Sequence, residues 1–385
     1  MTNVSARPRA HYLVMLGTAF DTKGGVSSVV NVYRQHGLFE RWPIIYLPTH
    51  CDGSKMLKFA RAARTLARYV LLLISGRVAV VHIHTSSGVS FWRKSAFILL
   101  AFLAGRRTII HLHGGEFADF YAKLHPPGRR FIRFVFDRAD CVIVLSSQWE
   151  TWMSGISRNR HIVRLFNPVV VPPSRGNSEH DPTHLLFLGR MSRDKGIYDL
   201  LEVIAELHPA HPRLHLSCAG DGEAQQVIAR ARELGIESAV EILGWVTGEA
   251  KRGLLASTGI LVLPSYFEGL PMSVLEAMAA GIPAVTTPVG GIPDAVEDGV
   301  NGYLVNPGDR SALRKALAIL LGDGLLRERM GSAARAKIAA SFSSDVVVPR
   351  LEEIYRELGM VPVASMESAA RSIGDGGPVY RPDGH

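Results

Sequence analysis

Two glutamates eight residues apart, Glu268 and Glu276, are the side chains of this sequence best placed to do chemistry together. Gly269, Leu270 and Pro271 follow the first glutamate, and they predict a turn leading into an apolar helix, with the proline in its first turn. One carboxylate then lies at the helix N-terminus and the other inside the helix. Backbone N–H groups at such a terminus attract phosphate, and carboxylates accept hydrogen bonds from sugar hydroxyls. The pair therefore indicates a nucleotide-sugar pocket.

Two basic residues, Arg190 and Lys195, lie five apart in a loop that begins at Gly189 and ends at Gly196. An arginine and a lysine on one loop can converge on a diphosphate and stabilise the charge that develops on it when a glycosidic bond breaks. The alternative is an ordinary solvated loop. Arg193 lies between the two, and we expect it not to contact the diphosphate.

Other glycine-rich loops also follow apolar runs. Gly24 and Gly25 allow a close backbone approach to a phosphate or to an acceptor. Gly220 suits the edge of a nucleotide pocket, although a plain turn explains it nearly as well. His113 ends an apolar run just before two glycines, so it is a candidate ligand of the donor sugar or its phosphate. A histidine that only packs in the core is the alternative.

Four histidines are spaced as pairs, His82 with His84 and His111 with His113. Residues two apart on a strand point to the same face, so the pairs could meet on neighbouring strands. Zinc is a known partner of such sets. No cysteine accompanies these histidines, and we expect no metal.

The stretch between the two glutamates resembles the donor-binding motif of the retaining glycosyltransferases of family 4. The basic loop and the glycine-rich loops follow in that family's order, over roughly residues 11–358. The resemblance implies the GT-B fold, with Glu276 on ribose hydroxyls, Glu268 on the transferred sugar, and Arg190 and Lys195 on the departing diphosphate. It also implies a nucleoside-diphosphate sugar as co-substrate and no cofactor. The expected catalytic residues are Glu268, Arg190, Lys195 and His113, and the expected donor-binding residues are Glu276, Gly24, Gly25, Gly269, Leu270, Gly220 and Gly189.

Strand-like apolar runs alternate with helix-like segments in both halves of the chain, which indicates an α/β protein with two Rossmann-like doubly wound domains facing a cleft. The runs are 12–16, 43–47, 78–84, 108–113 and 141–145, then 184–188, 213–219, 240–243, 260–264 and 282–286. The predicted organisation is an acceptor-binding domain (1–170), a linker (171–182), a nucleotide-sugar-binding domain (183–343), a closing helix (344–358) and a disordered tail (359–385).

The net charge of +8 is unevenly distributed. Residues 1–180 carry 24 Lys and Arg against 9 Asp and Glu, whereas residues 181–385 carry 19 against 26. A predicted helix near residues 55–70 is both basic and amphipathic, which is typical of a membrane-surface element. Its basic half carries Lys55, Lys58, Arg61, Arg64 and Arg68, and its apolar half carries Met56, Phe59, Ala63, Leu66, Ala67 and Val70. The alternative is a surface helix whose apolar half packs on the core.

These features predict a cytoplasmic protein bound to the inner face of the plasma membrane. No apolar run approaches the 20 or so residues that span a bilayer, and three widely spaced cysteines favour a reducing compartment. The basic half suggests an anionic, lipid-linked acceptor such as a polyprenyl-diphosphate sugar, used in surface or exopolysaccharide synthesis. Nucleic acid is not expected, because no nucleic-acid-binding motif accompanies the charge.

Other functions remain open at this stage. A nucleotide-sugar epimerase or a phosphorylase could share the fold, and a non-catalytic binding subunit is a third possibility. Such a subunit should have lost Glu268, Arg190 or Lys195, and all three are present. The sequence does not name the sugar, the base or the acceptor, because differences of a few kcal/mol between related sugars leave no readable motif.

Overall fold

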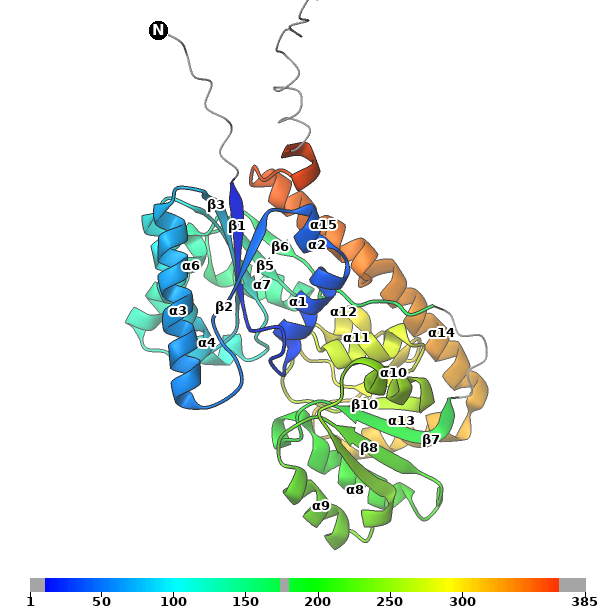
Figure 1. Ribbon diagram of the computed structural model, residues 1–385. Coiled ribbons are helices and arrows are strands. Elements are labelled where there is room, and N and C mark those ends of the chain that lie inside the picture. Colours follow the sequence, from blue (N-terminus) through cyan, green and yellow to red (C-terminus); the bar gives the residue numbers. More distant parts are fainter. Residues whose placement is uncertain (1–10, 174–179, 367–385) are drawn as a thin grey trace, which may run out of the picture.

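The computed structural model describes residues 11–173 and 180–366, and it contains two parallel six-stranded sheets with helices on both faces (Figure 1). The expected α/β architecture of two doubly wound domains is confirmed. Part of the expected linker, 174–179, and most of the expected tail, 367–385, lie outside the described residues. Residues 359–366 of that tail are described, and 363–366 form a helical turn.

The first sheet has the strand order β2-β1-β3-β4-β5-β6. Its strands are β1 (Tyr12–Gly17), β2 (Ile44–Pro48), β3 (Val78–Thr85), β4 (Arg107–Leu112), β5 (Cys141–Val144) and β6 (Ile162–Arg164). Its helices are α1 (Gly25–Gln35), α2 (Leu38–Arg41), α3 (Lys55–Ile74), α4 (Val89–Leu103), α5 (Phe117–Lys123), α6 (Pro126–Arg138) and α7 (Ser147–Ile156). The central strands are almost wholly buried, as expected where helices cover both faces of a parallel sheet.

The second sheet has the order β12-β11-β10-β7-β8-β9. Its strands are β7 (Asp181–Leu188), β8 (His215–Ala219), β9 (Val240–Gly244), β10 (Thr258–Leu263), β11 (Ala284–Thr286) and β12 (Gly302–Leu304). The helices are α8 (Ile197–Leu207), α9 (Ala224–Glu233), α10 (Gly248–Ser257), α11 (Met272–Ala279), α12 (Ile292–Ala295), α13 (Arg310–Gly322) and α14 (Gly324–Ser341), with short 3₁₀ turns η1 (Arg193–Lys195) and η2 (Glu237–Ala239).

Two details differ from the sequence expectation. Pro271 precedes helix α11 as its N-cap residue, with φ −71° and ψ 125°, instead of lying in its first turn. Strand β7 begins at Asp181, inside the segment expected to be linker, because this end of the strand pairs with Thr258 of β10.

Helix α15 (Ser344–Glu357) returns from the second domain to the first, as Figure 1 shows. Its Tyr355 is fully buried and packs edge-on against Trp42, with ring centroids 5.4 Å apart. Its Glu352 pairs with Arg41 at 2.8 Å. The expected closing helix therefore packs against the first domain while its N-terminal end continues from the second.

Candidate active site

In each sheet the order in which successive strands are added changes direction at one point. The candidate residues follow the strands on either side of that point. In the first sheet this point lies between β1 and β3, and in the second between β7 and β10. Ligands of doubly wound sheets bind outside the carboxyl ends of the strands at such points. Gly24 follows β1, Arg190 follows β7 and Glu268 follows β10, so the topology itself brings these loops to the cleft between the domains.

The structure joins Glu268 and Lys195 directly. The Lys195 ammonium donates a hydrogen bond to Glu268 Oε1 at 2.6 Å and another to the Phe267 carbonyl at 3.0 Å. Ser265 Oγ donates to the same Glu268 oxygen at 2.8 Å. The glutamate side chain is only 10% exposed. A mostly buried carboxylate and a cation are thus held side by side in a charge-assisted hydrogen bond.

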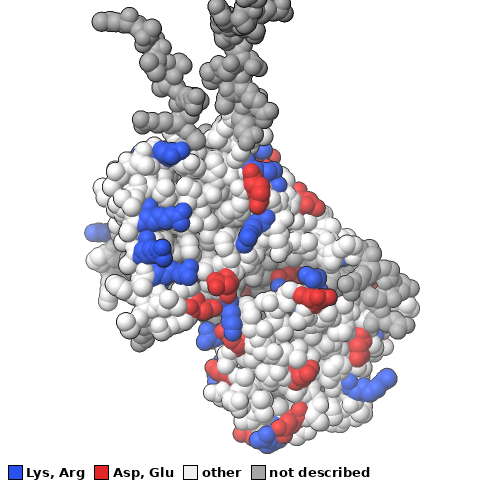
Figure 2. All heavy atoms as spheres, viewed as in Figure 1, with Lys and Arg blue, Asp and Glu red and all other residues white. Residues whose placement is uncertain are grey.

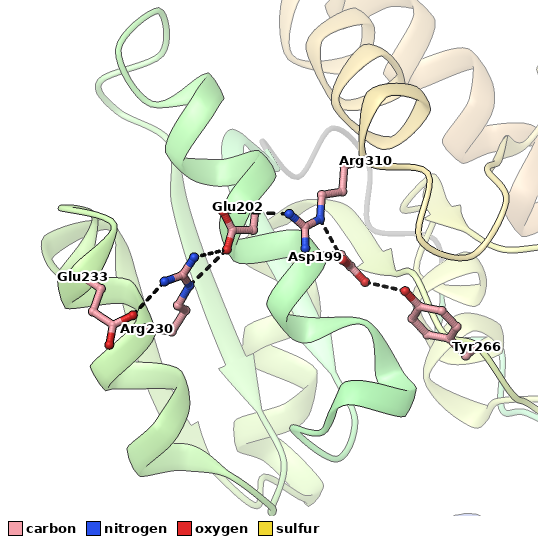
Figure 3. Close-up of polar contacts among 6 residues, drawn as sticks. All are labelled: Asp199, Glu202, Arg230, Glu233, Tyr266 and Arg310. Atoms are coloured by element: carbon pink, nitrogen blue, oxygen red, sulfur yellow. Dashed lines mark hydrogen bonds and ion pairs between the residues drawn. The ribbon is translucent and has the colours of Figure 1, made fainter.

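A polar network braces the loop that carries Glu268 (Figure 3). The Tyr266 hydroxyl donates to Asp199 of α8 at 2.9 Å, and Arg310 of α13 donates to the other oxygen of Asp199 at 2.8 Å. Arg230 of α9 extends the network through Glu202. Burial, aided by the bond to Asp199, raises the pKa of Tyr266, which keeps this phenol a hydrogen-bond donor. Helices of the second domain thereby fix the backbone two residues before the first glutamate.

Loops of the two domains pack backbone to backbone at this point. A Cβ at Gly115 would overlap the Glu268 carbonyl, and a Cβ at Gly269 would lie 2.6 Å from the His113 carbonyl oxygen. A Cβ at Gly290 would also overlap the Glu268 carbonyl. Gly269 therefore has a packing role, because it lets the loop after β4 approach the second-domain loop that carries Glu268.

His113 is mostly buried next to that contact. Its backbone N–H donates to Thr85 at 2.8 Å, and its Nε2 lies 2.8 Å from Nδ1 of His84. Burial, followed by repulsion from the Lys94 ammonium, lowers the pKa of His113 to about 3. The imidazole is therefore neutral at pH 7.

His82, His84, His111 and His113 stack into one group, which we call the histidine column. His82 Nδ1 lies 2.9 Å from the Tyr355 hydroxyl of α15, and His82 Nε2 lies 3.3 Å from His111 Nδ1. Nitrogens of His82, His84 and His111 lie within 4.8 Å of one another, as a metal site requires. However, most of these nitrogens already bond to each other or to Tyr355. The histidine column is therefore a hydrogen-bonded link from the closing helix α15 to the cleft between the domains.

The remaining glycines divide into open and packed positions. A Cβ at Gly24 or Gly25 would meet nothing within 4 Å, and no side chain caps α1, so its first N–H groups are available to an anion. Gly220 is different, because a Cβ there would overlap the carbonyl of Gly189. Gly189 follows β7 and Gly220 follows β8, so their close contact joins the ends of these two strands.

Arg190, which follows Gly189 in the chain, is exposed and forms no ion pair with any described residue.

Glu276 has a partner that the sequence did not indicate. Lys251 of α10 donates to Glu276 Oε1 at 2.7 Å, and both line a groove of about 2030 Å³ together with Ser28 and Asn31 of α1. Lys251 was missed because it follows no strand and has no glycine beside it. Leu270 is buried, and its carbonyl accepts from Asn167 at 2.8 Å, which ties the loop before α11 to the segment that follows β6.

Two doubly wound domains with this loop arrangement define the GT-B class, and the comparisons agree. The family described as "Glycosyl transferase 4-like domain" matches residues 21–168, and "Glycosyl transferases group 1" matches residues 173–337. The chain belongs to this group 1, GT4-like family of retaining glycosyltransferases.

Curated relatives include a D-inositol 3-phosphate glycosyltransferase of Corynebacterium jeikeium, 38% identical over 45% of this chain and 43% of its own length. An N-acetyl-alpha-D-glucosaminyl L-malate synthase of Bacillus anthracis is 31% identical over 60% of this chain and 64% of its own length. The chain thus spans less than two thirds of these relatives.

Solved structures confirm the GT-B fold. Anabaena HepE in complex with UDP and glucose superposes with a TM-score of 0.72, at 18% identity over 91% of this chain and 99% of HepE. A sucrose-phosphate synthase of Thermosynechococcus elongatus gives a TM-score of 0.73, at 18% identity over 90% of this chain and 99% of its own.

Proposed function

We propose that the protein transfers a hexose, with retention of configuration, from a nucleoside-diphosphate sugar to a lipid-linked glycan acceptor. The observation that carries the transferase activity is the Lys195–Glu268 pair, held where the His113 loop of the first domain meets the catalytic loop of the second. A UDP-sugar is the first donor to test, because HepE has been crystallised with UDP-glucose.

In this proposal each residue acts on one part of the donor. Glu276 accepts hydrogen bonds from ribose hydroxyls, and Glu268 holds hydroxyls of the transferred sugar. Arg190 and Lys195 stabilise the negative charge on the leaving diphosphate, and the free N–H groups of α1 add to the same field. The neutral His113 binds the donor by hydrogen bonds. The acceptor attacks from the side of the leaving group, and the diphosphate takes its proton.

The donor experiment measures melting temperature and release of nucleoside diphosphate with UDP-, GDP- and ADP-sugars. We expect one donor to stabilise the protein and to be hydrolysed slowly. Glu268→Gln should abolish turnover while the protein stays folded, and Glu353→Gln, an exposed glutamate on α15, should change neither signal. Stabilisation without any release by the unaltered protein would instead point to a non-catalytic binding subunit.

Helix α3 supports the membrane part of the proposal. Ser54 caps the helix, and its buried face consists of Thr65, Tyr69 and Leu73. The apolar side chains nearer its start do not pack on the core, since Met56 is 84% and Phe59 is 75% exposed. Figure 2 shows basic side chains gathered over α3, and Arg61, Arg64 and Arg68 are exposed there. Exposed apolar and basic groups on one helix suit an anionic lipid surface.

Among the described residues, no helix has the length and apolar character needed to cross a membrane. The proposal is therefore peripheral binding, at the cytoplasmic face of the plasma membrane. Each basic residue near an anionic surface contributes about 1 kcal/mol.

Replacing Arg61, Arg64 and Arg68 together by glutamine is expected to weaken binding to phosphatidylglycerol vesicles about 100-fold at low salt. Vesicle co-sedimentation measures the effect. A matched variant that loses three exposed arginines elsewhere, Arg213, Arg314 and Arg350, should bind as the unaltered protein does. Binding that is indifferent to salt and to the α3 arginines would contradict the membrane proposal.

A further inference from the structure

His84 connects the histidine column to His113 by a single hydrogen bond. Its Nδ1 lies 2.8 Å from His113 Nε2. The other ring nitrogen of His84, Nε2, is enclosed and has no hydrogen-bond partner among the described residues. Most buried polar groups in proteins are hydrogen-bonded, so an enclosed nitrogen without a partner limits where the ring proton of His84 can lie.

Both rings of this pair are neutral at pH 7. Burial lowers the pKa of His113 to about 3 and that of His84 well below its usual value. No carboxylate in the described ranges forms an ion pair with either ring, so none of these carboxylates stabilises a second ring proton. A neutral imidazole carries one N–H, and its other nitrogen is a hydrogen-bond acceptor. Each ring therefore holds one proton, either on Nδ1 or on Nε2.

Two proton arrangements fit the 2.8 Å contact, because one of the two nitrogens must donate and the other must accept. If His113 donated from Nε2, the proton of His84 would lie on its enclosed Nε2, as a buried N–H without an acceptor. If His84 donates from Nδ1, its enclosed Nε2 holds only a lone pair. Buried backbone N–H groups without an acceptor are rarer than under-satisfied buried carbonyls, and the same asymmetry favours the second arrangement here.

The second arrangement fixes the proton of His113 as well. Because Nε2 of His113 accepts from His84, its own proton lies on Nδ1. Nδ1 of His113 has no hydrogen-bond partner among the described residues and, unlike Nε2 of His84, it is not enclosed. His113 is partly exposed and lies beside the loop that carries Glu268, where a Cβ at Gly269 would be 2.6 Å from its carbonyl oxygen. His113 therefore presents an open N–H, which can donate a hydrogen bond and cannot accept one.

We propose that His84 is a positioning residue for sugar transfer. Its Nδ1–H holds the ring of His113 and keeps the proton of His113 on Nδ1, so that His113 donates a hydrogen bond to an oxygen of the nucleotide sugar. The inference rests on the proposed function, which places His113 on the sugar donor, and it adds the direction of that hydrogen bond and the residue that sets it. An oxygen that gains negative charge as the diphosphate leaves accepts such a bond more strongly, so the effect appears in kcat.

Nitrogen-15 NMR of the full chain, labelled at its histidine rings, locates this proton directly. The chain has 15 histidines, and the signals of His113 are those that disappear in His113→Gln. We expect the proton of His113 on Nδ1 at pH 7, both in the protein alone and with UDP added. A His113 proton on Nε2 in the unaltered protein would overturn the proposal.

Two variants at His84 separate the hydrogen bond from the space that the ring fills. His84→Gln keeps an N–H donor at this place, so kcat for donor hydrolysis should stay within about threefold of the unaltered value. His84→Leu leaves Nε2 of His113 without a hydrogen-bond donor, so kcat should fall about tenfold while KM for the sugar donor changes less. Equal kcat in the two variants would overturn the positioning role.

His111→Leu is the matched control for the loss of a buried imidazole. His111 is fully buried and its Nε2 is also enclosed, but its Nδ1 lies 3.3 Å from His82 Nε2, and it forms no hydrogen bond with His113. This variant should leave the proton of His113 on Nδ1, whereas His84→Leu should move part of it to Nε2. The same shift in both leucine variants would mean that packing alone orients His113, and it would overturn the role of His84.

Failure of the proposed function has a different signature. It would appear as no release of nucleoside diphosphate from any sugar donor, whereas the NMR measurement reports the proton of His113 without any turnover.

Discussion

Replacing Lys195 by alanine is expected to lower kcat for sugar transfer and for donor hydrolysis about 100- to 1,000-fold. The η1 turn holds the ammonium 2.6 Å from Glu268 Oε1, and the proposed function places the leaving diphosphate beside this pair. A positioned charge that acts on the transition state raises kcat, whereas uniform binding changes only KM. Initial rates of nucleoside diphosphate release measure the effect.

Arg193 provides the matched control, because it lies on the same turn. Its guanidinium sits over the Tyr198 ring at 5.0 Å and forms no ion pair with a described residue. Arg193→Ala should therefore keep kcat within about threefold of the unaltered enzyme, as surface changes usually do. A Lys195→Ala variant that is as active as Arg193→Ala would remove Lys195 from the catalytic residues.

The Lys195 variant also leaves Glu268 without its cation, so the two roles must be separated. If both residues act on one transition state, the double variant Lys195→Ala/Glu268→Gln should be no slower than the slower single variant. Fully additive losses would mean that the residues act on different steps.

The sequence predicted the strands that position the site because those strands are locally encoded. Central strands such as β1 and β10 are continuous apolar runs that end at glycine-rich or polar loops, and such runs are recognisable without tertiary context. The edge strands β6 and β12 were missed. Each is three residues long and only partly buried, so the apolar pattern is too short to be recognised as a strand.

The sequence did not reveal the pairings that tertiary contact makes around the site. Lys251 reaches Glu276 from a different helix, and Asp294 accepts hydrogen bonds from the N–H and hydroxyl of Ser147, both at 3.1 Å, across the two domains. Neither pairing has a local signature, because the partners lie 25 and 147 residues apart. Long-range pairs of this kind depend on the fold as a whole.

Helix α3 shows a different limit of sequence patterns. The sequence pattern places Met56, Phe59 and Ala67 on the apolar half of the helix, but all three are exposed, and the buried face is formed by Thr65, Tyr69 and Leu73. In the structure Tyr69 is fully buried and Met56 is 84% exposed. An amphipathic pattern identifies the apolar face of a helix. Only the packing of the rest of the domain decides how much of that face is buried.

The histidine column should make the protein sensitive to acid well above the range in which carboxylates titrate. Burial lowers the pKa of His82 to about 3 and those of His84 and His111 well below their usual value. The unfolded chain binds protons at these side chains below about pH 6.5, whereas the folded chain does not. Stability is therefore full above pH 6.5 and falls as the pH drops towards 3.

Each of these three histidines is expected to cost about 2 kcal/mol of unfolding free energy between pH 7 and pH 5. Together these losses are comparable to the total unfolding free energy of an ordinary domain, which is about 5–15 kcal/mol. Urea denaturation at the two pH values measures the loss.

His82→Gln should reduce the difference in unfolding free energy between pH 7 and pH 5 by about 2 kcal/mol, whatever its effect on absolute stability. His125→Gln, an exposed histidine, should leave the difference unchanged. Equal pH dependence in the two variants would mean that His82 takes up a proton in the folded protein as readily as in the unfolded chain.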